Sequence, residues 1–146
     1  MLKFTKMLNR NTNHKEVLRN LDILVVDDIS AVRNILTQIL RGLGVGGRID
    51  KAEDGLEAWE MMQKSDYDLI ICDIRMPRMS GLELKKLLRS TPRFGELPFL
   101  MITGEVSEDM MARAVESKWD GYLLKPFPSV VLEKSLLKLL GKADKI

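Results

Sequence analysis

The chain has 146 residues, 45% hydrophobic and 30% charged, with a formal net charge of +2. This length suits one domain with a full hydrophobic core, and the composition excludes the disordered and membrane-embedded classes. No apolar run is long enough to span a bilayer, and residues 1–16 lack the continuous apolar core of a secretory signal.

The start of the chain is basic. Residues 1–20 contain five Lys or Arg and one acid, which leaves 18 basic and 20 acidic residues for the rest. We therefore treat 1–20 as a basic N-terminal extension and expect no nucleic-acid binding by the near-neutral body. Asn13 and Glu16 have the spacing of a capping box, so this extension either forms a short helix packed on the domain or is disordered.

Five short apolar runs alternate with five amphipathic segments along the rest of the chain. The expected strands are 23–26, 48–52, 68–72, 98–102 and 121–124. The expected helices are 32–43, 55–64, 81–90, 107–117 and 128–140, the last one stopping at Gly141 and leaving 142–146 as a tail. Three of the runs are continuous rather than alternating, which is typical of parallel strands covered on both faces. The pattern predicts an α/β fold, a doubly wound five-stranded parallel sheet with helices on both faces.

Polar residues stand where the predicted strands end. Asp27 and Asp28 follow the first strand, Asp73 the third, Thr103 the fourth and Lys125 the fifth. In an open parallel sheet these ends share one edge, where functional groups gather. Taken singly, each has a plainer explanation: Asp28 as a helix cap, Thr103 as a turn cap and Lys125 as a solvated lysine.

Three carboxylates at one edge require a positive charge among them. Two carboxylates about 4 Å apart repel by roughly 4 kcal/mol at an intermediate dielectric. Lys125 and a bound divalent cation are the candidates, and an all-oxygen cluster suits Mg²⁺. No set of softer ligands competes, because the chain has one histidine, His14, and one cysteine, Cys72. A lone cysteine forms no internal disulfide, which fits a reducing cytoplasm.

The same residues suit phosphoryl chemistry. Carboxylates form aspartyl-phosphate intermediates, so Asp73 is the natural nucleophile. Mg²⁺ and the Lys125 ammonium would neutralise the charge on a transferring phosphoryl group, and the Thr103 hydroxyl would hydrogen-bond one of its oxygens.

Four motifs resemble the receiver domain of two-component response regulators, the CheY-like family. They are VVDD at 25–28, DIRMPRMSG at 73–81, MITG at 101–104 and GYLLKPF at 121–127. The four motifs occur in order at the ends of the expected strands, so we assign 21–141 to a receiver domain. The resemblance implies a flavodoxin-like strand order of 2-1-3-4-5. It also implies a phosphoacceptor switch with slow autodephosphorylation rather than an enzyme.

The resemblance implies specific roles at the strand ends. Asp73 would accept a phosphoryl group from a histidine kinase or a histidine phosphotransfer protein. Asp28, Asp73 and the backbone carbonyl of Arg75 would coordinate Mg²⁺, with Asp27 acting through water. In this family the peptide bond between Lys125 and the following proline is usually cis.

The family also implies a switch. Thr103 would move toward the phosphoryl group and Tyr122 would turn inward, altering the face made by the fourth helix, fifth strand and fifth helix for a downstream protein target. Lys118 and Trp119 replace a small Gly-Ala pair of the family, so the fourth helix lacks its usual glycine cap. These two residues, with Met110 and Tyr122, are candidates for the partner face, although packing is the favoured explanation for Trp119.

Arg75 and Glu105 each stand two residues beyond a motif residue, Asp73 and Thr103. We hypothesise that they pair across the phosphoryl pocket, restrict attacking water and slow dephosphorylation. The alternative is a loose, solvated pair that contributes little.

Other functions fit less well. A hydrolase of the haloacid-dehalogenase type carries Asp-x-Asp after its first strand, whereas here the acids are adjacent. A flavodoxin needs a Ser/Thr-rich phosphate loop where this chain has two acids. Two alternatives remain: a receiver-like interaction module that works without phosphorylation, and a receiver cut from a larger regulator.

Overall fold

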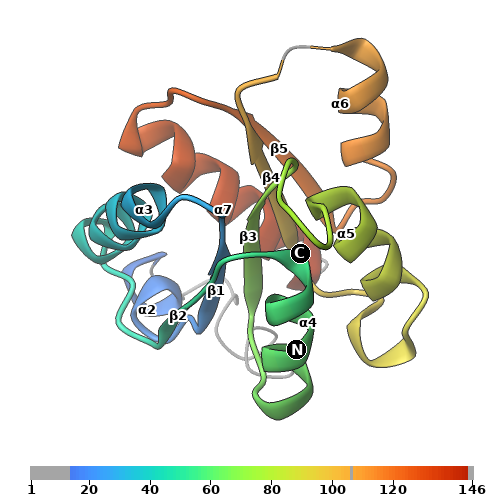
Figure 1. The fold of residues 1–146 in the computed structure, drawn as a ribbon. Coiled ribbons are helices and arrows are strands. Elements are labelled where there is room, and N and C mark those ends of the chain that lie inside the picture. The colour runs from blue at the N-terminus through green and yellow to red at the C-terminus, as the bar shows by residue number, and fades with distance from the viewer. Residues whose placement is uncertain (1–13, 106, 145–146) are drawn as a thin grey trace.

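The computed structural model describes residues 14–105 and 107–144 (Figure 1). The elements are α2 (His14–Arg19), β1 (Ile23–Val26), α3 (Ser30–Leu43), β2 (Ile49–Ala52), α4 (Gly55–Lys64), β3 (Leu69–Asp73), α5 (Gly81–Arg89), a 3₁₀ turn (Pro92–Phe94), β4 (Phe99–Thr103), α6 (Glu108–Ala114), β5 (Asp120–Leu124) and α7 (Ser129–Asp144). The strands are parallel and lie in the order β2-β1-β3-β4-β5. The predicted α/β fold and strand order are confirmed.

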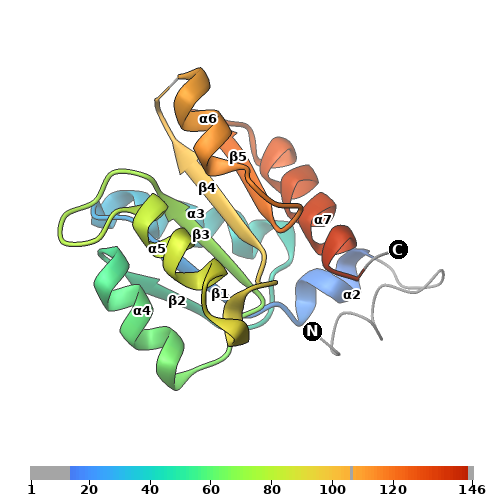
Figure 2. The ribbon, with the colours of Figure 1, turned by 90° about the vertical axis from the view of Figure 1, so that its right-hand side faces the viewer.

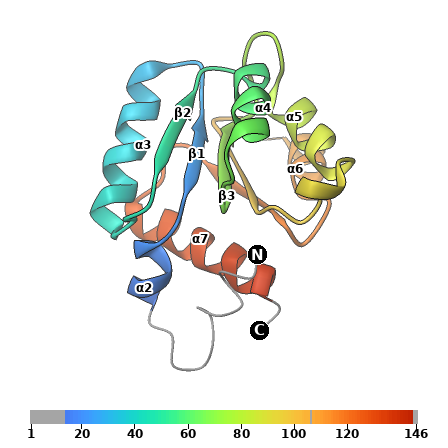
Figure 3. The same cartoon turned by 90° about the horizontal axis from the view of Figure 1, so that it is seen from below.

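Two hydrophobic clusters cover the two faces of the sheet. Side chains of α2, α3 and α7 form one cluster, and side chains of α4, α5 and α6 form the other. Figure 3 shows α3 and α7 on one side of the sheet and α4, α5 and α6 on the other. Successive β1 residues alternate between the clusters: Ile23 and Val25 enter the first, Leu24 and Val26 the second. All four are buried, which is why the strand is continuously apolar.

Helix α2 is part of the folded unit. Val17 and Leu18 are buried in the first cluster, and the Gly46 N–H donates to the Leu18 carbonyl at 3.1 Å. The same cluster contains Leu136, Leu139 and Leu140 of α7, and Figure 2 shows α2 on the α7 side of the sheet. Residues 14–19 of the basic extension are thus helical and packed, while the expected cap residue Asn13 lies outside the described residues.

Two predicted helix ends are wrong. Helix α7 continues through Gly141 to Asp144, because a glycine ends a helix when it adopts a left-handed conformation. Among the described glycines, that conformation occurs at Gly44, which caps α3 with φ 106°. Helix α6 ends at Ala114 rather than at residue 117. No helix within the described ranges is long and apolar enough to cross a membrane.

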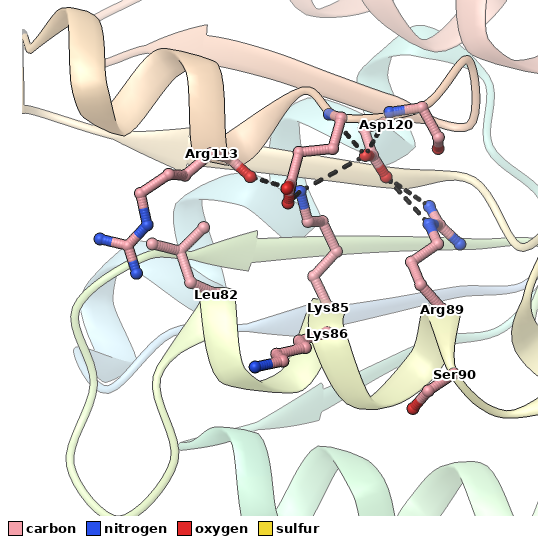
Figure 4. A pocket seen from close by; sticks show the side chains of 9 residues that line it. Leu82, Lys85, Lys86, Arg89, Ser90, Arg113 and Asp120 are labelled. Carbon is pink, nitrogen blue, oxygen red and sulfur yellow. Dashed lines mark hydrogen bonds and ion pairs between the residues drawn. The ribbon is translucent and has the colours of Figure 1, made fainter.

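The early end of α6 is caused by a buried lysine on α5. Lys85 is 2% exposed, and its Nζ donates to the carbonyl oxygen of Arg113 at 2.6 Å (Figure 4) and to that of Ala114 at 2.9 Å. The lysine thus satisfies the last carbonyls of α6 in place of a glycine cap.

A buried carboxylate on β5 completes the same contact. Asp120 Oδ2 accepts from the backbone N–H groups of Glu116 and Ser117, both at 3.0 Å, and lies 3.3 Å from Lys85 Nζ. Its Oδ1 accepts from Arg89 Nη2 at 2.6 Å. We call Lys85, Arg89 and Asp120 the α5–β5 ion cluster; it holds residues 115–117 out of the helix.

Candidate functional site

The strand register brings the predicted site residues to one edge of the sheet. Val26 pairs with Cys72, so Asp27 and Asp73 stand at neighbouring strand ends. Thr103 pairs with Leu124, so Thr103 and Lys125 stand at the neighbouring ends of β4 and β5. Asp73 and Thr103 are themselves the last residues of β3 and β4, one position later than predicted.

Three carboxylates meet at this edge. Asp27, Asp28 and Asp73 each place an oxygen within 4.8 Å of the others. Asp27 is buried, Asp28 is exposed and Asp73 lies between, its side chain 14% exposed. The plainer explanation of Asp28 as a helix cap does not hold, because the N-cap of α3 is Ile29 and makes no side-chain cap bond.

Lys125 supplies a positive charge to the cluster. Its Nζ donates to Asp27 Oδ2 at 3.1 Å and to Asp73 Oδ2 at 3.4 Å, and its side chain is 27% exposed. The lysine is therefore not a freely solvated one. The Lys125–Pro126 peptide bond is cis, as the family resemblance implies.

The pKa values at the site reflect two carboxylates that share one ammonium. Burial raises the pKa of Asp73; Lys125 opposes this shift and Asp27 adds to it, so the pKa stays above its ordinary value. For Lys125, burial lowers the pKa, but the charges of Asp73 and Asp27 outweigh it and the pKa is raised. The site therefore has an excess of negative charge that a cation would relieve.

Thr103 and Tyr122 both contact the loop after β4. The buried Thr103 hydroxyl oxygen accepts from the Glu105 N–H at 3.2 Å, and the Tyr122 hydroxyl donates to the Glu105 carbonyl at 2.5 Å. Thr103 thus caps the turn after β4, which is the non-catalytic role that the sequence also allowed. One loop residue connects the Thr103 hydroxyl to the aromatic ring on β5.

This edge combines hard oxygen ligands, a reachable carboxylate, an ammonium group and a hydroxyl group, the parts that phosphoryl transfer requires. A family model described as the response regulator receiver domain matches residues 23–137. The chain belongs to this family. The receiver family acts as a phosphoacceptor switch in two-component signalling.

Similarity to individual receiver proteins supports this assignment. The chain is 38% identical to the chemotaxis protein CheY-3 of Vibrio cholerae over 124 residues, 85% of this chain and 95% of the relative. The solved structure of CheY4 of Vibrio cholerae is 33% identical with a TM-score of 0.72, covering 82% of this chain and 98% of that one. The receiver domain of a sensor histidine kinase from Pseudomonas aeruginosa shares the fold at 24% identity and a TM-score of 0.73, covering 84% of this chain and 98% of that one. Its structure has a magnesium ion coordinated in the active site cleft.

The hypothesised pair across the pocket of this receiver domain is present. Arg75 Nε hydrogen-bonds Glu105 Oε1, which bridges the loops after β3 and β4. The Arg75 side chain is 73% exposed and that of Glu105 is 32% exposed.

The suggested partner face is not assembled as one surface. Met110 on α6 is half-buried against the second cluster. Lys118 and Trp119 precede β5 and therefore lie at the opposite edge of the sheet from Lys125. Trp119 is 8% exposed, and Lys118 Nζ lies 4.7 Å from the centre of its ring. The Trp119 indole therefore has a packing role, which the sequence analysis favoured over a partner contact, and little of its surface is available to a partner.

Sequence reasoning missed two arginines, one that contacts Asp27 of the site and one that contacts Asp54 at the start of α4. Arg33 Nη1 on α3 donates to the Asp27 carbonyl at 2.5 Å. Arg78 Nε, in the loop after β3, donates to Asp54 Oδ2 at 2.6 Å. Arg33 gave no sequence signal, whereas Arg78 lies within the quoted motif at 73–81.

Proposed function

We propose that Asp73 accepts a phosphoryl group from a phosphohistidine donor, with Mg²⁺ beside it, and thereby changes the face of α6, β5 and α7 toward a protein target. The observation that carries the proposal is the convergence of three carboxylates within 4.8 Å of one another, with Lys125 bound to two of them.

The acidic residues fit Mg²⁺. Asp27 is engaged by Lys125 and by the Ile29 N–H at 2.9 Å, which leaves it to act through water. Asp28, Asp73 and the backbone carbonyl of Arg75 would hold the ion directly, an oxygen set that this ion prefers. When bound, Mg²⁺ neutralises charge on the phosphoryl oxygens.

The protein's own groups would carry the transfer. A carboxylate oxygen of Asp73 forms the new bond to phosphorus, and the bond from phosphorus to the donor imidazole nitrogen breaks. The imidazole keeps the electron pair and takes a proton. Asp73 Oδ1 already accepts from the Ile74 N–H at 2.7 Å, which fixes the carboxylate plane. The Lys125 ammonium, 3.4 Å from Oδ2, is placed to stabilise the developing negative charge.

The switch would act through Glu105. The Thr103 hydroxyl hydrogen would donate to a phosphoryl oxygen, and the turn of this side chain toward the anion would take its oxygen away from the Glu105 N–H. Movement of the released Glu105 would break the bond between its carbonyl and the Tyr122 hydroxyl, so that Tyr122 could turn and the loop leading to α6 could move.

An apolar hollow next to the site supports the proposal that the phosphoryl donor is another protein. It measures about 290 Å³ and lies between α3 and the loop that connects β5 to α7. Its lining includes Ile35, which is 55% exposed, together with Ile39, Phe127 and the stem of Lys125. Exposed apolar side chains beside a charged site are typical of a docking surface for another protein, here a histidine kinase or phosphotransfer protein.

The direct test uses the wild-type chain, Mg²⁺ and acetyl phosphate, followed by intact mass measurement. We expect a gain of one phosphoryl group that requires Mg²⁺ and is prevented by a chelator. Absence of the adduct, together with no Mg²⁺ binding, would contradict the proposal and favour a phosphorylation-independent module.

The Arg75–Glu105 pair should lengthen the life of the phosphorylated state, which we expect to hydrolyse slowly. Arg75→Ala is expected to speed loss of the phosphoryl group by about threefold to fivefold, because an exposed pair contributes at most about 1 kcal/mol. The decay of the adduct mass with time measures this rate. Arg93→Ala, which removes another exposed pair at Asp66, is the matched control; an unchanged lifetime in Arg75→Ala would show a merely solvated pair.

A further inference from the structure

We infer that Arg78 is a positioning residue for the metal side of the site, acting through its ion pair with Asp54. This inference rests on the proposed function and deepens it. The loop from Ile74 to Ser80 carries the Arg75 carbonyl that would bind Mg²⁺, and Arg78 ties this loop to the start of α4. Figure 2 shows the loop beside that end of α4.

Arg78 holds an unfavourable backbone conformation. Its φ is 64°, and among the described residues it is the one non-glycine residue with positive φ. An arginine has no side-chain reason to prefer the left-handed region, which glycine and asparagine adopt more readily. The surrounding contacts must therefore compensate for this conformation.

The contact that compensates is a nearly buried carboxylate. The Asp54 side chain is 4% exposed and uses both oxygens: Oδ1 accepts from the Glu57 N–H at 2.9 Å as the N-cap of α4, and Oδ2 accepts from Arg78 Nε at 2.6 Å. Burial alone would raise the Asp54 pKa, but the bonds from Arg78 and Glu57 outweigh it and the pKa is lowered. Asp54 is thus a charged anchor held by a helix.

A backbone contact beside the ion pair confirms that the loop docks here. The Gly55 N–H donates to the Met79 carbonyl at 3.0 Å. A Cβ at Gly55 would lie 2.6 Å from the same oxygen, so the two segments approach as closely as glycine allows.

The loop is therefore fixed on both sides of Arg75. On the strand side, the Gly81 N–H donates to the Ile74 carbonyl at 2.8 Å, and the Ile74 N–H donates to Asp73. On the far side, Arg78 and Met79 are held by the start of α4. Releasing Arg78 frees the segment that presents the Arg75 carbonyl, and the preorganisation of a metal ligand is lost.

The test compares Mg²⁺ dissociation constants, measured by calorimetry, for the wild-type chain and Arg78→Asn. Asparagine tolerates positive φ but loses the ion pair, so the variant should remain folded with a lower free energy of unfolding, because Asp54 loses its counter-charge. We expect Mg²⁺ binding to weaken by about tenfold, the lower end of the range for residues that orient metal ligands. Amide chemical shifts at Arg75 should change in the absence of Mg²⁺.

Asp54→Asn provides the second variant, since asparagine keeps the cap of α4 and removes the charge. It should weaken Mg²⁺ binding to the same extent, and the double variant should be no weaker than either single one. Arg93→Asn, at the exposed Asp66 pair, is the control and should bind as the wild type does.

Wild-type Mg²⁺ affinity in both Arg78→Asn and Asp54→Asn would overturn the inference, as would an equal loss in Arg93→Asn. A wild-type chain that neither binds Mg²⁺ nor gains a phosphoryl group would instead overturn the proposed function, and the inference with it.

Discussion

An Asp73→Asn variant is expected to take up no phosphoryl group from acetyl phosphate under conditions that modify the wild-type chain. The amide lacks the anionic oxygen that would attack phosphorus, and no equivalent group replaces it at the end of β3. Intact mass measurement with Mg²⁺ detects the difference. Asp66→Asn, which alters an exposed aspartate that pairs with Arg93, is the matched control and should be modified normally.

Misfolding should not explain this loss. Burial is the largest cause of the raised Asp73 pKa, so the folded state disfavours the charged carboxylate. A raised pKa means that any stability contributed by this group is present at low pH and lost as the pH rises through the folded-state value. At neutral pH the neutral amide should therefore leave the free energy of unfolding unchanged or higher. A persistent adduct in Asp73→Asn would assign the phosphoacceptor to another carboxylate.

Asp120→Asn is expected to lower the free energy of unfolding by about 3 kcal/mol, because it leaves a buried ammonium without its buried counter-charge. Asp120 and Lys85 are 1% and 2% exposed, and Arg89 is 18% exposed. Urea unfolding measures the change. Glu116→Gln removes the other carboxylate near Lys85, which is 67% exposed, and should cost less than about 1 kcal/mol. Equal losses in the two variants would contradict a special role for the buried pair.

The same carboxylate gives a pH dependence. Burial raises the Asp120 pKa, but the hydrogen bond and charge of Arg89 and the charge of Lys85 outweigh it, so the pKa lies below the ordinary 3.8. A lowered folded-state pKa contributes stability that is present above 3.8 and lost as the pH falls through the folded-state value. The stability difference between wild type and Asp120→Asn should therefore shrink as the pH falls below about 4. Between about pH 5 and pH 8 it should stay constant, because this range lies roughly one unit or more above the titration of the carboxyl group.

Much of the fold follows from local sequence. The runs at 23–26 and 69–72 are apolar at every position because both faces of their strands are buried, and period and run length are properties of the sequence alone. The ends of parallel strands share an edge, so the sequence predicts that the acids at 27, 28 and 73 converge, as they do in the structure. Asp54 as the cap of α4 is likewise a local effect, since its partner Glu57 is three residues away.

The sequence by itself thus determined the strand order through its family motifs, the place of the acidic cluster and the residues available for phosphoryl chemistry. Only the tertiary structure decided where α6 ends and how the phosphoacceptor loop is held. Lys85 occupies a core position of α5, in the same stripe as Leu84 and Leu88, yet its partner Asp120 is 35 residues away. Arg78 and Asp54 are 24 residues apart. Such pairings depend on how the strands place distant segments together, and no local pattern encodes them.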